Sequence, residues 1–97
     1  MTKIEILHRI GREGRFMTIY YFTFRSMTGA LNAVGKLKSR GFRVTPIRTP
    51  EHLRKKGCGY CIPVPEETFR ELYGTLKHGD YEKLYRHREG EWKELTL

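Results

Sequence analysis

Both cysteines of the chain, Cys58 and Cys61, lie in one short segment at the end of its most basic stretch. The thiolate, not the thiol, is the nucleophilic form of cysteine, and adjacent Lys or Arg charge favours it. Three cations precede Cys58 and would supply this electrostatic support: Arg54, Lys55 and Lys56. The pattern therefore predicts a site of sulfur chemistry at these cysteines.

The residues around the cysteines allow three interpretations of this segment: an exposed reactive thiol, a dithiol reductase, or a structural turn. Gly57 and Gly59 flank Cys58, which allows a tight turn with positive φ and leaves little cover over the sulfur. A Cys-x-x-Cys pair also occurs in dithiol reductases, but there the first cysteine begins a helix, and the prolines within residues 62–65 oppose a helix here. The third interpretation is that both cysteines are small residues packed in a turn.

Histidines give little indication of a metal or cofactor site. His52 precedes Cys58 by six residues and is a candidate proton donor, although a surface histidine is the simpler interpretation. The other histidines are scattered without the spacing of zinc ligands. We expect no metal and no cofactor.

Composition limits the kind of protein. A chain of 97 residues is long enough for one modest core, and the net charge of +8 predicts attraction to anions. No apolar run reaches the roughly 20 residues of a membrane helix, so we expect a cytoplasmic protein that does not bind membranes. The basic residues between 36 and 56 form a solvated face, a docking surface for an acidic protein, or an RNA-binding patch.

Hydrophobic periodicity predicts an α+β fold. Strands are expected where aromatic and β-branched residues cluster or alternate with polar ones, and helices where apolar residues recur every three or four positions. Ser26 and Gly41 would bound the first helix, Pro46 indicates an edge strand, and residues 89–91 a hairpin turn. The expected elements are a strand at 17–24, a helix at 27–40, a strand at 42–47, a loop at 48–58, a strand at 60–64, a helix from 65 to 76, and strands at 81–87 and 92–97.

This order predicts a ferredoxin-like βαββαβ sandwich with an additional C-terminal hairpin strand, both helices covering one face of the sheet. Residues 17–97 would form a single domain. Residues 1–16 would be either an N-terminal extension or an added edge strand. Tyr20, Tyr21 and Phe22 faintly suggest an RNA-binding sheet, but core packing is the simpler interpretation.

A longer frame of residues resembles a known family. Its parts are Phe24-Arg25-Ser26, Ala30 and Ala33, Lys38-Ser39-Arg40-Gly41-Phe42, Ile47-Arg48-Thr49-Pro50, and Gly57-Cys58-Gly59 followed by a strand and a helix. This frame, over roughly residues 19–86, is similar to the selenium/sulfur carrier-like family. The Cys-Gly pair from which that family's carrier role is inferred corresponds to Cys58 and Gly59.

The resemblance implies a carrier rather than a turnover enzyme. Cys58 would hold sulfur or selenium as a persulfide or perselenide, taken from a donor such as a cysteine desulfurase or selenocysteine lyase and passed to an acceptor protein. Cys61 is not a position of the family pattern. Its spacing suggests a resolving thiol that forms a disulfide with Cys58 and releases the cargo. An RNA- or protein-interaction module with incidental cysteines, and a small dithiol redox protein, remain the alternatives.

Overall fold

The computed structural model describes residues 17–54, 57, 59–77 and 79–95. The two expectations for residues 1–16 lie outside the described residues. The elements are β1 (Thr18–Phe24), α2 (Met27–Ser39), β2 (Ile47–Arg48), α3 (Glu51–Arg54), β3 (Tyr60–Pro65), α4 (Glu66–Leu72), β4 (Lys83–Arg88) and β5 (Glu91–Leu95).

The strands form one antiparallel sheet in the order β2-β3-β1-β4-β5. The β1–α2–β2 connection passes over β3, and the β3–α4–β4 connection passes over β1. This interleaving of two βαβ units is the ferredoxin-like arrangement. The predicted fold class is therefore confirmed, and β5 is the predicted additional hairpin strand.

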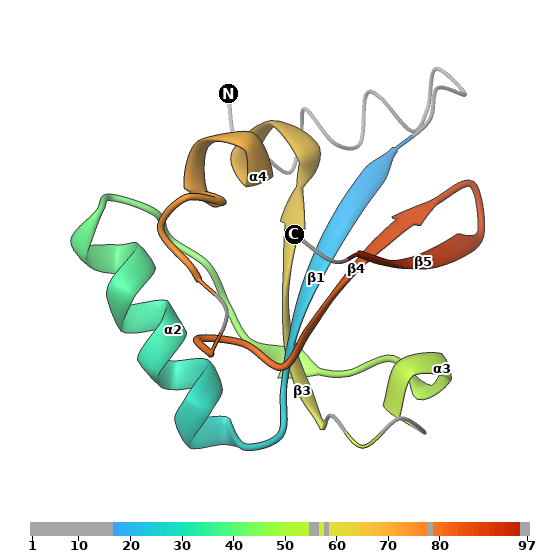
Figure 1. Cartoon of the computed structure of the whole chain (residues 1–97), viewed down its shortest axis with the longest axis horizontal. Coiled ribbons are helices and arrows are strands. Elements are labelled where there is room, and N and C mark those ends of the chain that lie inside the picture. The colour runs from blue at the N-terminus through green and yellow to red at the C-terminus, as the bar shows by residue number, and fades with distance from the viewer. Residues whose placement is uncertain (1–16, 55–56, 58, 78, 96–97) are drawn as a thin grey trace.

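The main core lies between the sheet and the helices α2 and α4, which Figure 1 shows on the same side of the strands. Alternate residues of β1 supply it, because successive side chains of a strand point to opposite faces. Tyr20 stacks on Phe69 of α4, with ring centroids 3.8 Å apart, and Phe22 lies 5.9 Å from the same ring. The interpretation of Tyr20 and Phe22 as core residues is confirmed.

Helix α2 begins and ends close to the predicted residues. The Gly29 N–H donates to Ser26 Oγ at 3.1 Å, and Gly41 follows the helix with a φ of +90°. Its buried residues are Ala30, Ala33 and Leu37, and Val34 is partly buried against the same core. Leu31 is 54% exposed, although its spacing from Met27 is typical of the buried face of a helix.

The prediction of a strand at residues 42–47 was wrong in extent, since β2 contains only Ile47 and Arg48. The Thr49 N–H donates to the Gly59 carbonyl at 3.1 Å, and Ile47 lies opposite Cys61. Continuing that register would place Thr45 opposite Pro63 and Arg43 opposite Pro65, at the alternate positions that exchange hydrogen bonds. Proline has no N–H to donate, so the ladder stops.

Of two C-terminal predictions, one needed a smaller correction and the other is confirmed. Helix α4 ends at Leu72 rather than Leu76, because Gly74 lowers the helix propensity of the next turn. Leu76 is nevertheless buried in the main core. The predicted hairpin is confirmed: Glu89 and Gly90 have φ values of 52° and 81°, and two positive φ angles suit the twist of adjoining strands.

Candidate functional site

The segment that contains the Cys-Gly pair connects the edge strand β2 to β3. Its base is closed by the Arg48–Tyr60 strand pair and by the hydrogen bond from the Thr49 N–H to the Gly59 carbonyl. The Arg48 guanidinium also lies 5.8 Å from the centre of the Tyr60 ring. The sheet therefore fixes both ends of the connection, including the residue that follows Cys58 in sequence.

The short helix α3 within this connection was not predicted from the sequence. The Pro50 carbonyl accepts hydrogen bonds from the N–H groups of Leu53 and Arg54, each at 2.9 Å. Four residues are too few to show a hydrophobic repeat, which is why residues 48–58 were predicted to be loop. The available signal was Pro50 followed by Glu51, a favourable start for a helix.

Gly57 has the conformation expected of it. Its φ is +94°, and its N–H donates to the Arg54 carbonyl at 3.1 Å, which turns the chain directly after α3. Gly59 does not have a positive φ, and a Cβ atom there would meet nothing within 4 Å. Of the two glycines, only Gly57 therefore has a positive φ. Cys58, Lys55 and Lys56 lie outside the described residues, and their proposed roles stay predictions.

Cys61 lies in β3 on the face of the sheet opposite the main core. Its partners in the neighbouring strands are Thr23 and Ile47, and its own exposed fraction is 0%. Leu53 of α3 and Tyr85 of β4 are also buried outside the main core cluster. Figure 1 shows α3 on the side of the sheet away from α2 and α4.

Burial raises the pKa of Cys61 from 9.0 to about 11. The Thr49 hydroxyl has the opposite, smaller effect on this pKa. Its contact with sulfur is weak, because Thr49 Oγ1 is buried without a hydrogen-bond partner of ordinary geometry among the described residues. Burial, and secondarily a charge on Cys61, raises the pKa of Tyr21 as well. Cys61 is therefore a protonated thiol at neutral pH.

His52 belongs to an aromatic stack rather than to a polar site. Its ring lies 5.7 Å from that of Trp92, at an interplanar angle of 22°, and Trp92 stacks on His87 at 4.1 Å. Trp92 also packs against Tyr21 of β1, with the two ring centroids 4.9 Å apart. Trp92 thus packs the terminal hairpin against β1 and α3. The stack attaches α3 to β5.

Other kinds of site find little support in the described ranges. No three His, Cys, Asp or Glu residues there are grouped so as to hold a metal ion. No helix in those ranges is long and apolar enough to cross a membrane.

Fold and connection together define the class: a small ferredoxin-like α+β domain that carries a Cys-Gly pair between β2 and β3. The family model described as "Putative Se/S carrier protein-like" matches residues 19–86, and the chain belongs to this family. No curated protein and no solved structure gives a significant match.

Proposed function

We propose that this protein carries reactive sulfur or selenium on Cys58, as a persulfide or perselenide, between a donor and an acceptor protein. Membership of the carrier family supports the general role. Cys58 and Gly59 correspond to the Cys-Gly pair of that family, which supports the choice of residue.

The observation that carries the proposal is the burial of Cys61. The chain has two cysteines, and a carrier must present a thiolate to other proteins. Cys61 is 0% exposed and its pKa is raised to about 11, so it is poorly suited to that task. Cys58, beside Gly57 and after Lys55 and Lys56, is the better candidate.

Loading is a transfer of one zero-valent chalcogen atom. The Cys58 thiolate attacks the outer sulfur of a donor cysteine persulfide, the donor S–S bond breaks, and the donor thiolate leaves. The product is a persulfide anion on Cys58, and no net oxidation occurs. Arg54, Lys55 and Lys56 would stabilise both the thiolate and this anionic product. A perselenide donor gives the analogous S–Se product.

Unloading to an acceptor is the same reaction in the opposite direction. Where no acceptor is present, we propose that Cys61 acts as a slow resolving thiol. Its sulfur attacks the Cys58 sulfur, a Cys58–Cys61 disulfide forms, and the outer sulfur leaves as hydrogen sulfide, so two cysteine sulfurs are oxidised while one sulfur is reduced. A thiol reductant must then restore the dithiol. Cys61 has to leave its buried position, which requires opening of the two-residue β2–β3 ladder.

The cytoplasm, where ordinary thiols stay reduced, is the expected compartment. The direct test is to incubate reduced protein with a cysteine desulfurase and cysteine, or with a selenocysteine lyase and selenocysteine, and to record intact mass. We expect wild type and Cys61→Ala to gain about 32 daltons for sulfur or about 79 for selenium. Cys58→Ala should gain neither; absence of an adduct in every protein would refute the carrier function.

A further inference from the structure

The β4–β5 hairpin places two cations directly opposite each other. Arg86 pairs with Lys93 in the antiparallel register, so both side chains leave the same face of the sheet. Like charges in such a cross-strand pair repel and destabilise the hairpin. On the same face, two residues nearer the turn, Arg88 lies opposite Glu91.

Among the described residues, no carboxylate forms an ion pair with either member of this pair. Several other cations in the described part of the chain form ion pairs: Arg25, Lys36, Arg70 and Lys83. Within that same part, neither Arg86 nor Lys93 forms one. Lys93 is exposed, whereas Arg86 is half-buried opposite Tyr20 of β1. An uncompensated pair of this kind suits an anion from outside the chain.

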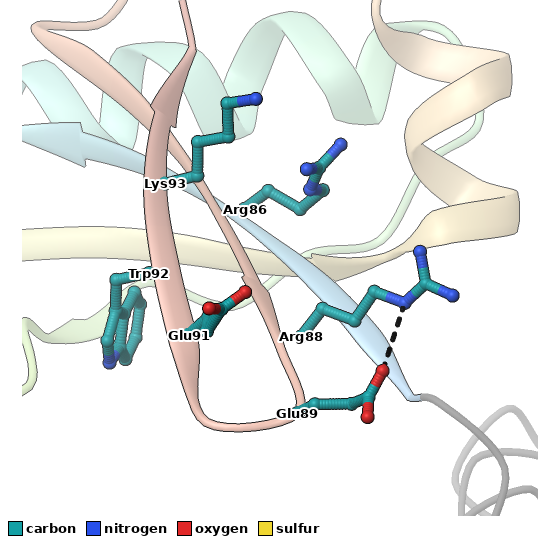
Figure 2. A pocket seen from close by; sticks show the side chains of 6 residues that line it. All are labelled: Arg86, Arg88, Glu89, Glu91, Trp92 and Lys93. Atoms are coloured by element: carbon teal, nitrogen blue, oxygen red, sulfur yellow. Dashed lines mark ion pairs between the residues drawn. The ribbon is translucent and has the colours of Figure 1, made fainter.

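The cations line a hollow in the surface. Its volume is about 450 Å³, within the range of about 300–1,000 Å³ typical of small-molecule sites. In Figure 2 the head groups of Lys93, Arg86 and Arg88 lie along the same side of the hairpin, whereas Trp92 projects from the other side. Trp92 also lines the hollow, so the aromatic stack at His52 borders it.

We propose that this hollow, the hairpin pocket, binds a tetrahedral oxyanion: phosphate, either free or as a small phosphomonoester. Arg86 offers planar N–H donors that match two oxygens of such a group, and Lys93 adds a compact positive charge. A small organic substituent on the phosphate also fits the hollow.

Two carboxylates set the strength of the site. Glu89 lies 3.9 Å from the Nε of Arg88, and Glu91 lines the hollow opposite Arg88. Both repel an incoming anion, so the wild-type site should be weak. Removing the Glu91 charge should therefore improve binding.

The experiment is an amide chemical-shift titration of ¹⁵N-labelled full-length protein at pH 7. The probes are inorganic phosphate and O-phosphoserine, with sodium chloride used to hold ionic strength constant and serine as the phosphate-free control. Arg86→Gln and Lys93→Gln should each weaken phosphate binding by about five- to tenfold, and Glu91→Gln should tighten it by about two- to fivefold. The matched control is Lys38→Gln with Arg40→Gln, two exposed cations of α2 and its C-cap.

Saturable shifts at residues 86–93 that the Arg86→Gln, Lys93→Gln double variant loses and the control keeps would support the hairpin pocket. The tighter of the two probes then identifies free phosphate or an ester as the ligand source. Equal shifts with chloride, or undiminished binding by the double variant, would overturn the proposal. The double variant should fold, because it removes a repulsive pair; Glu91→Gln provides an independent test of opposite sign.

Discussion

The reactivity of Cys61 is the property that the structure predicts most sharply. Replacement of Cys58 by Ala leaves Cys61 as the single thiol. Burial raises its pKa from 9.0 to about 11. At pH 8 the thiolate fraction then falls from about one in ten to about one in a thousand. Alkylation should therefore be at least about a hundredfold slower than in the unfolded chain.

The assay is iodoacetamide labelling of Cys58→Ala at pH 8, followed by intact mass, in native buffer and in concentrated guanidinium chloride. The unfolded protein supplies the reference rate for the same cysteine. Cys61→Ala, labelled in parallel, reports on Cys58 alone and should react at least as fast as an ordinary thiol. Native labelling of Cys58→Ala at the unfolded rate would refute the burial of Cys61 and the division of roles between the two cysteines.

Three further predictions follow from the fold. The folded state binds the Cys61 proton more tightly than the unfolded state does, so the free energy of unfolding should be insensitive to this group below pH 9 and fall by about 2–3 kcal/mol as pH rises through about 11. In denaturant titrations at several pH values, the free energy of unfolding should fall less steeply with pH for Cys61→Ala than for wild type. An equal fall in both proteins would contradict the raised pKa. Leu53→Ala should destabilise the protein by about 2–4 kcal/mol at pH 7, since this side chain is 1% exposed. The matched control Leu31→Ala, at a position 54% exposed, should change stability by less than about 0.5 kcal/mol. Equal losses of stability in chemical denaturation would be inconsistent with the packing of α3. Pro63→Thr should restore an N–H opposite Thr45 and lengthen β2, so the new amide should be protected in hydrogen-exchange measurements. Exchange at the rate of an unstructured amide would contradict the inference that Pro63 ends the β2–β3 ladder.

Elements with a strong local signal were predictable from sequence. The aromatic composition around Tyr20 and Phe22 predicts a strand. Ser26 and Gly41 mark the ends of α2, because capping depends on local residues and not on the rest of the fold. The hairpin at Glu89 and Gly90 was also predictable, because its turn depends on the local residues. Their order along the chain was enough to predict the ferredoxin-like topology.

Features that depend on distant residues were not predictable. The alternation in residues 42–47 is strand-like, but pairing there depends on Pro63 and Pro65, which lie opposite only after the sheet has formed. Cys61 is likewise buried between neighbours that are distant in sequence, since it lies opposite Thr23 of β1 and Ile47 of β2, and only its place within β3 was predictable. The Cys-Gly pair was recognisable because it is a local motif within a longer frame.

The location of the cargo atom tests the central claim most directly. Trypsin cleaves after Lys56 and Arg70, so both cysteines fall in one peptide, and fragment ions that separate Gly59 from Tyr60 distinguish them. After loading by a cysteine desulfurase and blocking of the persulfide, we predict that the fragment containing Cys58 carries the extra sulfur and that Cys61 is recovered as an unmodified thiol. Extra sulfur on the Cys61 fragment would contradict it.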